Sequence, residues 1–181
     1  KLPTIMQDNN LLGLLVIFTS QWMMQRVFDA LDEKLQERIL MQGSVSKSAL
    51  LDQHKAQVDQ GQQSIIFGLA SFAEGIDLPG KYCQHLIITK LPFANPSSPV
   101  EKTRTQHLER NGKNPFFDHS LPETSVRLTQ YVGRLIRTQE DVGLISILDA
   151  RLTHKRYAQR LLENLPPFSI HHEYSLANAE A

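Results

Sequence analysis

The residues best suited to chemistry lie in the segment 130–137, which reads QYVGRLIR. In a helix, Gln130, Arg134 and Arg137 are spaced i, i+4 and i+7, so they would share one face. Gly133 would leave a gap beside that face, where a ligand or another backbone could approach. Two guanidinium groups and an amide on one rigid face suit an anion with several oxygens, such as a triphosphate. The alternative is a solvated basic face of a surface helix.

A second segment, residues 71–80, reads SFAEGIDLPG and follows an apolar run at 64–68 that predicts a buried strand. Sheets of the α/β class place ligand sites where such a strand turns into the next element. Gly75 would let backbone approach a ligand. The carboxylates of Glu74 and Asp77 could accept hydrogen bonds from ribose hydroxyls or hold the arginines of the first segment. An ordinary turn with a capping aspartate is the alternative.

Together the two segments resemble motifs V and VI of superfamily 2 helicases, in this order and about 50 residues apart. The sequence AEGID at 73–77, combined with QxxGRxxR at 130–137, is similar to the XPD/DinG branch of that superfamily. The sequence KLPF at 90–93, followed by Pro96 and Pro99, also resembles the DinG-type bacterial enzymes. The resemblance covers roughly residues 12–168 and depends on several separated motifs.

The resemblance implies roles for the first segment in phosphoryl transfer. Arg137 aligns with the arginine finger, and Arg134 aligns with a partner near the γ-phosphate of ATP bound to another domain. Gln130 would position the groups around them. Guanidinium groups supplied across a cleft stabilise the charge that spreads over the phosphoryl oxygens.

In the second segment, the resemblance implies that the loop couples the nucleotide to the DNA path. The residues assigned to the nucleotide are Glu74, Gly75 and Asp77, together with Gly133 of the first segment. DNA contacts are expected at Thr19 and Ser20, where the first strand ends, and at Ser71. Hydroxyls and helix N-terminal amides bind phosphates without reading bases, and plain N-capping is compatible with that role.

Three further features stay open at this point. Gln42-Gly43 could touch DNA, although a turn is the preferred interpretation. Arg151 resembles the arginine that follows motif VI and could reach the cleft or pair with Asp149. Phe116-Phe117 lies in a polar loop and is a candidate contact for DNA or a partner protein. Two other aromatic residues are predicted to lie in the core, Trp22 and Tyr131.

Composition limits the class of protein and its cofactors. Hydrophobic content of 41% and charged content of 21% suit a soluble globular domain. Lys+Arg and Asp+Glu both number 19, so any DNA-binding surface must be local. The single cysteine, Cys83, excludes a disulfide framework or a cysteine-ligated metal site within the chain and is predicted to be a core residue. No apolar run approaches the ~20 residues of a membrane span, and no secretory segment is present, so a cytoplasmic location without membrane contact is expected.

The chain contains no GxxxxGK[S/T] phosphate loop. A helicase needs that loop, so we expect this chain to be the second motor domain of a longer protein. ATP and Mg²⁺ would be bound mainly by the first domain, which would also carry any iron–sulfur cluster. No metal site is predicted here, because His171-His172 has no further ligands nearby. Expected partners are single-stranded DNA, the first RecA-like domain of the same protein, and a replication or repair protein.

Strand and helix signals alternate along the chain. Strands are predicted at 14–18, 38–41, 62–68, 84–89 and 142–148, with an added edge strand at 168–170. Helices are predicted from residue 20 to 35, from 46, within 101–113, from 124 and over 153–165, with caps at Thr19-Ser20, Ser46 and Thr124-Ser125. The fold class is therefore α/β, a RecA-like parallel β-sheet flanked by helices on both faces. One domain is expected over 1–170, with an insertion at about 92–122 and a flexible tail at 171–181.

The hypothesis from sequence is the C-terminal motor domain of an ATP-dependent DNA helicase of the DinG/XPD type. The resemblance implies 5′ to 3′ movement and a role in DNA repair and replication. The isolated chain is expected not to hydrolyse ATP. The alternative is a non-catalytic RecA-like module that docks on a replication or repair protein through loop 92–122 and the tail.

Overall fold

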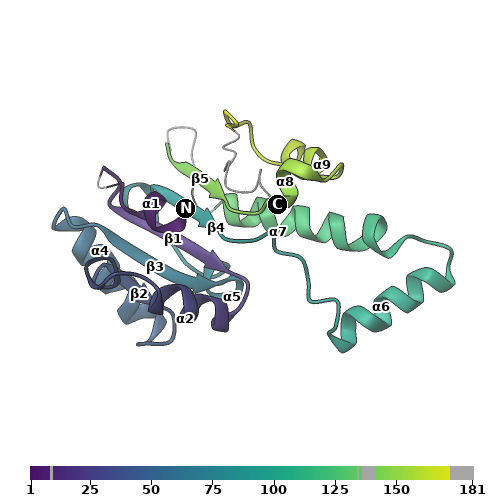
Figure 1. Ribbon diagram of the computed structural model, residues 1–181, viewed down its shortest axis with the longest axis horizontal. Helices are drawn as coiled ribbons and strands as arrows, with labels where there is room; N and C mark the ends of the chain where they lie inside the picture. The colour runs from purple at the N-terminus through teal and green to yellow at the C-terminus, as the bar shows by residue number, and fades with distance from the viewer. Residues whose placement is uncertain (9, 134, 136–141, 172–181) are drawn as a thin grey trace, which may run out of the picture.

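The computed structural model describes residues 1–8, 10–133, 135 and 142–171 (Figure 1). Within these ranges, five parallel strands form one sheet in the order β2-β3-β1-β4-β5. The strands are β1 (Gly13–Phe18), β2 (Ile39–Met41), β3 (Ser64–Leu69), β4 (His85–Ile88) and β5 (Leu144–Ile147). The five predicted strands are confirmed. The sixth prediction is wrong, because residues 168–170 form no strand.

Both faces of the sheet are covered, because successive side chains of a strand point to opposite sides. Leu14, Val16 and Phe18 of β1 pack in a cluster with buried side chains from α1 (Leu2–Met6), α2 (Gln21–Asp29) and α3 (Glu33–Gln36). Leu15 and Ile17 pack in a second cluster with α4 (Lys47–Asp59), α7 (Leu121–Val132) and α9 (Ala158–Glu163). The predicted α/β architecture is therefore confirmed.

Two of the predicted helix caps are present. The Oγ of Ser20 accepts a hydrogen bond from the Met23 amide (3.2 Å), and that of Ser46 accepts one from the Ala49 amide (3.3 Å). The single helix predicted over 20–35 is instead two helices. Asp32 divides them because its carboxylate accepts a hydrogen bond from the Leu35 amide at 3.0 Å and starts α3 anew.

The prediction that Trp22 lies in the core is wrong. Trp22 is 66% exposed, whereas Met24 is 1% exposed. Residues two apart on a helix point about 200° away from each other, so burial of Met24 turns Trp22 toward solvent. Met23, Val27 and Leu31 pack beside the core as the helical spacing predicts. Tyr131 is 2% exposed, as predicted.

The connection from β4 to α7 extends away from the sheet and carries α6 (Pro99–Arg110) (Figure 1). A π-helical segment, η2 (Phe116–Ser120), runs directly into α7. The prediction of a helix cap at Thr124-Ser125 is wrong, because both residues are buried inside α7. The Thr124 hydroxyl donates to the Ser120 carbonyl (2.7 Å), which is how hydroxyl residues behave in a helix interior.

The remaining elements are short. They are α5 (Ala70–Ala73), η1 (Gly80–Tyr82) and α8 (Arg151–His154). The single helix predicted over 153–165 is divided between α8 and α9, because Lys155 has an extended backbone (ψ 136°). A Cβ on Gly13 would lie 2.4 Å from the carbonyl carbon of Tyr82, so a glycine is needed for η1 to pack against β1. None of the helices described is both long and apolar enough to cross a membrane.

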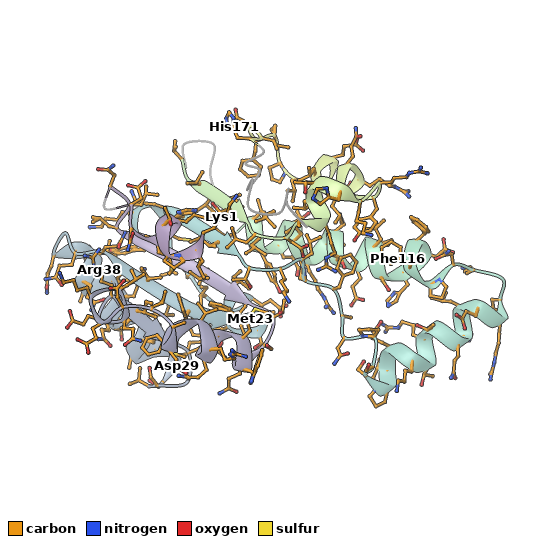
Figure 2. The ribbon with its side chains drawn as sticks, viewed as in Figure 1. Lys1, Met23, Asp29, Arg38, Phe116 and His171 are labelled. Carbon is orange, nitrogen blue, oxygen red and sulfur yellow. The ribbon has the colours of Figure 1, made fainter. Side chains whose placement is uncertain are left out.

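The direction of the strands decides where the polar turns meet. Met23, in the first turn of α2, lies at the end toward which the strands run, and Arg38, just before β2, lies at the opposite end (Figure 2). Because β2, β3 and β1 are neighbours, the turns that follow these three strands come together at one edge of the sheet. We call this the carboxyl edge, formed by residues 19–20, 42–47 and 70–72.

Candidate functional site

The three residues predicted to contact DNA all lie at the carboxyl edge. Thr19 and Ser20 follow β1 and are exposed. Ser71 is exposed in α5, which contacts both β3 and β1. Ser20 caps α2 with its hydroxyl, so the first-turn amides of that helix open onto the same edge. The structure therefore brings together residues that are about 50 positions apart in the sequence.

A shallow hollow of about 200 Å³ lies beside Ser71. The side-chain Oε1 of Gln42 accepts a hydrogen bond from the Leu69 backbone amide (2.7 Å), which fastens the turn after β2 to the end of β3. Gly43 has φ +94°, a conformation that favours glycine. Gln42-Gly43 therefore forms the predicted turn, and the same two residues line one side of the hollow. The lining residues are Gln42, Gly43, Val45, Lys47, Ser71 and Phe72.

Lys47 is a residue that the sequence analysis missed. Its Nζ donates a hydrogen bond to the Phe72 carbonyl (3.3 Å) and lies 5.1 Å from the centroid of the Phe72 ring. A Cβ on Gly75 would lie 2.6 Å from this Nζ, so Gly75 leaves room for the ammonium group. One signal was available, because Lys47 is the first residue of α4, where the helix dipole disfavours a cation.

The two motif segments pack against each other. Ile76 and Leu78 from the loop share one hydrophobic cluster with Tyr131 and Leu135. Burial, together with the negative charge of Glu74, raises the pKa of Tyr131 to about 12. Glu74 and Tyr131 are thus close enough to interact electrostatically. The neighbouring loop positions Glu74, Gly75 and Asp77 are all exposed.

Gln130 is exposed near the end of α7 and lines a second hollow, of about 450 Å³. The other lining residues are Pro122, Ser125, Val126, Thr129 and Asn164. Gly133 is the C-cap of α7, and its amide donates to the Thr129 carbonyl at 2.9 Å. Arg134 and Arg137 lie outside the described residues, so the common face that they were predicted to share with Gln130 stays a prediction.

Arg151 pairs with Asp149. Its Nη2 lies 2.6 Å from Asp149 Oδ2, and its Nε donates to both carboxylate oxygens at 2.9 and 3.1 Å. Asp149 also accepts a hydrogen bond from the Leu91 amide (2.8 Å). Burial opposes ionisation of this carboxyl, but the hydrogen bonds from Arg151 and Leu91 hold the pKa of Asp149 below its ordinary value. The pair thus joins the end of β5 to the segment after β4.

The aromatic pair in the predicted loop has two different environments. Phe116 packs against Phe93 (ring centroids 5.9 Å apart) and Tyr157 (5.1 Å), which ties η2 to the segment before α9. Phe117 touches Phe116 but is 49% exposed. Of the two, only Phe117 remains a surface candidate for a partner contact.

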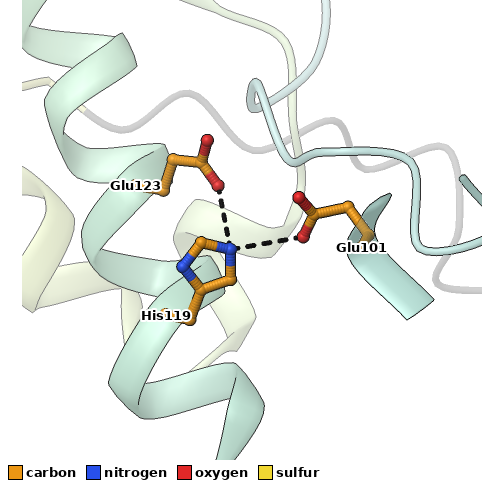
Figure 3. Close-up of side chains that lie close together, drawn as sticks. All are labelled: Glu101, His119 and Glu123. Atoms are coloured by element: carbon orange, nitrogen blue, oxygen red, sulfur yellow. Dashed lines mark ion pairs between the residues drawn. The ribbon is translucent and has the colours of Figure 1, made fainter. Parts of the chain in front are cut away.

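Glu101, His119 and Glu123 converge between α6 and α7 (Figure 3). The Nε2 of His119 lies 3.3 Å from one oxygen of each glutamate. Such a group could hold a metal ion, but each carboxylate already has a guanidinium partner. Arg104 lies 3.3 Å from Glu101, and Arg127 lies 2.7 Å from Glu123. We therefore interpret these residues as a clasp of polar and charged side chains that joins α6 to η2 and α7.

Three buried titratable residues are structural. His54 bonds the Tyr82 carbonyl (2.7 Å) and Ser64 (2.9 Å), and burial lowers its pKa. His85 lies 2.9 Å from Ser146, and burial lowers its pKa to about 4. Cys83 is 2% exposed, and burial raises the pKa of its thiol to about 12, which suits the predicted core position and not a metal ligand or nucleophile.

This fold is similar to that of known helicases. The solved structure described as "XPD_APO" superposes with a TM-score of 0.66 and 20% identity, covering 84% of this chain and 31% of that one. The structure of S. tokodaii Xpd4 gives a TM-score of 0.61 at 18% identity, covering 93% of this chain and 33% of that one. At such low identity the similarity concerns the RecA-like fold alone.

Sequence comparison identifies the family of the chain, which the structural similarity alone does not. Residues 4–168 match the family described as Helicase C-terminal domain, and the chain belongs to this family. It is similar to the ATP-dependent DNA helicases DinG of Photobacterium profundum (46% identity, 89% of this chain, 24% of the relative) and Escherichia coli K12 (41%, 88% and 22%). The chain thus spans about a quarter of the length of these curated relatives.

Proposed function

We propose that this chain is the second motor domain of an ATP-dependent DNA helicase of the DinG type. One observation carries the proposal most directly. The loop that contains Glu74 packs against α7 in a single hydrophobic cluster, while the hydroxyls of Thr19, Ser20 and Ser71 lie at the carboxyl edge of the same sheet. Groups suited to a nucleotide and groups suited to a DNA backbone are thus parts of one rigid unit. The names of the DinG relatives support this activity.

In the whole protein, the first RecA-like domain would bind ATP and Mg²⁺. Arg137 would then act as the arginine finger, with Arg134 beside the γ-phosphate and Gln130 positioning both. Guanidinium groups at this place stabilise charge that develops in the transition state. Glu74, Gly75 and Asp77, with Gly133 at the end of α7, would transmit the state of the nucleotide to the DNA path. From the family resemblance we also propose that the whole protein moves 5′ to 3′ on DNA and acts in DNA repair and replication in the cytoplasm.

The family resemblance implies that an iron–sulfur cluster can be present in the whole protein. This chain lacks the several cysteines that would ligate such a cluster. Cys83 is the one cysteine of the sequence, and burial raises the pKa of its thiol to about 12. Any such cluster would therefore take its ligands from the first domain. The contribution of this chain is the arginines, the coupling loop and part of the DNA path.

The test is Arg137→Ala in the full-length protein. We expect DNA-stimulated ATP turnover to fall by roughly 10³–10⁵, because the arginine stabilises the transition state more than bound ATP. KM for ATP and the affinity for single-stranded DNA should change less. Arg137→Lys should not restore turnover, because an ammonium cannot make the two-pronged contact.

The matched control is Arg110→Ala, which removes an exposed arginine at the end of α6. It should leave turnover unchanged. Near-normal turnover of Arg137→Ala would disprove the assignment. Loss of the folded circular dichroism spectrum in that variant would instead mark Arg137 as a structural residue.

The second candidate function is a non-catalytic interaction module, and the projection of α6 away from the sheet favours it (Figure 1). A replication or repair protein would then bind the loop 92–122. A pull-down with the full-length protein, compared with a variant in which residues 99–110 are replaced by a flexible linker, separates the two readings. The motor hypothesis expects ATP turnover by the full-length protein that survives this replacement, whereas the module hypothesis expects no ATP turnover and loss of partner binding after the replacement.

A further inference from the structure

Trp22 is an exposed aromatic residue with one ring face already covered. The guanidinium carbon of Arg26 lies 4.9 Å from the centroid of its ring, and the two residues are one helical turn apart on α2. Trp22 is nevertheless 66% exposed. A large ring surface is therefore open to a ligand, with a cation already beside one of its faces.

The position of Trp22 indicates what its open surface meets. It lies two residues after Ser20, whose hydroxyl caps α2, in the first turn of the same helix. The hydroxyls and amides there suit a phosphate, and an indole in the same turn suits the base attached to it. Arg26 adds a positive charge beside the ring, which favours a polyanion over an apolar partner surface.

We propose that Trp22 is a base-stacking residue for single-stranded DNA that crosses the carboxyl edge, with Arg26 supporting the ring from its other face. This inference rests on the proposed function and extends it to a residue outside the motifs. Stacking on an exposed indole tolerates any base, because every base has a π-face. A duplex is excluded as the ligand, because its bases are already stacked on each other.

The sequence provides a direct probe, because Trp22 is its single tryptophan. The 181-residue chain is titrated at low salt with a thymidine oligonucleotide of about 12 nucleotides, a length within the usual range of single-strand sites. We expect the tryptophan emission to be quenched on binding. An abasic oligonucleotide of the same length carries the same phosphates and should leave the emission unchanged.

Affinity is measured separately by anisotropy of a labelled oligonucleotide. Trp22→Ala is expected to weaken binding roughly tenfold, and Trp22→Phe is expected to retain most of the affinity because it keeps a ring. The matched control is Val100→Ala, which removes an exposed apolar side chain on α6 and should bind like the wild type. Circular dichroism confirms that each variant is folded.

The inference is overturned by emission that stays constant while the wild type becomes saturated with the thymidine oligonucleotide, or by wild-type affinity in Trp22→Ala. Equal quenching by the abasic oligonucleotide also overturns it, since that response would come from a shift of the helix. If the wild type binds no single-stranded DNA at all, the proposed DNA path fails as well. DNA binding with unchanged Trp22 emission removes the stacking role alone.

Discussion

Lys47 occupies a position that helix electrostatics disfavour. As the first residue of α4 it places a cation at the positive end of the helix dipole, which costs a few tenths of a kcal/mol. Its ammonium nevertheless lies over Phe72 and beside Ser71 in the hollow of the carboxyl edge. A residue kept at a small cost in stability, at the edge where DNA is proposed to pass, is a candidate phosphate contact.

We predict that Lys47→Met weakens single-stranded DNA binding of the chain and reduces the slope of log K against log salt by about one, because one fewer counterion is released. The wild-type slope itself should be shallow, on the order of 2–4 counterions. Lys102→Met, on α6, is the matched control and should leave the slope unchanged. If both variants keep the wild-type slope, Lys47 does not touch a phosphate.

Asp149 and Arg151 allow a second prediction for single residues. Asp149→Ala removes the acceptor of the Leu91 amide and the partner of the Arg151 guanidinium. We expect the free energy of unfolding to fall by about 1–3 kcal/mol, the cost of leaving buried donors unpaired. Urea unfolding measures this, with Glu109→Ala on α6 as the exposed control. An unchanged stability combined with lost ATP turnover in the full-length protein would instead assign Arg151 to the catalytic cleft.

At the scale of elements, the clasp of Glu101, His119 and Glu123 is what connects the projecting helix α6 to α7. We predict that Glu101→Ala speeds hydrogen exchange of the α6 amides while the midpoint of thermal unfolding hardly moves. Partly exposed ion pairs contribute only about 0.2–1 kcal/mol to global stability, whereas local opening of α6 depends on the contacts that this helix itself makes. Glu109→Gln is the control on the same helix. Exchange that accelerates equally in the sheet would show that the clasp supports the core.

The sequence predicted those elements whose signals are local. The apolar runs of the strands and the caps at Ser20 and Ser46 were visible because a strand or a cap involves neighbouring residues. The cap predicted at Thr124 was wrong because a hydroxyl can accept a hydrogen bond from a backbone amide at a helix start or donate one to a carbonyl within the helix. Trp22 was predicted to lie in the core, although Met24 and Phe28 are the residues of α2 that pack there together with Met23 and Val27.

The candidate site was predictable only in part, for a physical reason. Thr19, Ser20 and Ser71 were predicted from their places just after two predicted strands and from the family resemblance, and their contact with DNA stays a prediction. Lys47 and the hollow beside it were missed, because they depend on which turns become neighbours when the strand order is β2-β3-β1. The clasp was missed for the same reason, since it joins two helices through side chains about 20 residues apart.

For the whole molecule, the buried histidines predict acid sensitivity. An unfolded histidine has a pKa of about 6.5, and burial lowers the pKa of His85 to about 4 in the folded state. Between these pH values the unfolded chain binds protons that the folded chain does not. The contribution of His85 to the free energy of unfolding is therefore fully present above about pH 6.5 and is lost as the pH falls toward 4. The shift of His85 corresponds to roughly 3 kcal/mol, and the lowered pKa of His54 acts in the same direction.

Urea unfolding at pH 7.5 and pH 5 measures this loss. His85→Asn is expected to be less stable than the wild type at pH 7.5 but to lose less stability between the two pH values. His107→Gln, which removes an exposed histidine on α6, should reproduce the wild-type difference. A His85→Asn variant with the full wild-type difference would show that other groups cause the acid sensitivity.

The central place of β1 also has a consequence for how the chain is made. On one side its Gly13 pairs with Ser64, and on the other its Leu14 pairs with His85, so its partners follow it by about 50 and 70 residues. At a synthesis rate of ~5–20 residues per second, this wholly apolar strand waits several seconds before both partners exist. During that interval the nascent chain exposes an unpaired GLLVIF segment that holdase chaperones would recognise. Newly made protein should therefore depend on such chaperones more than the finished, fully paired sheet does.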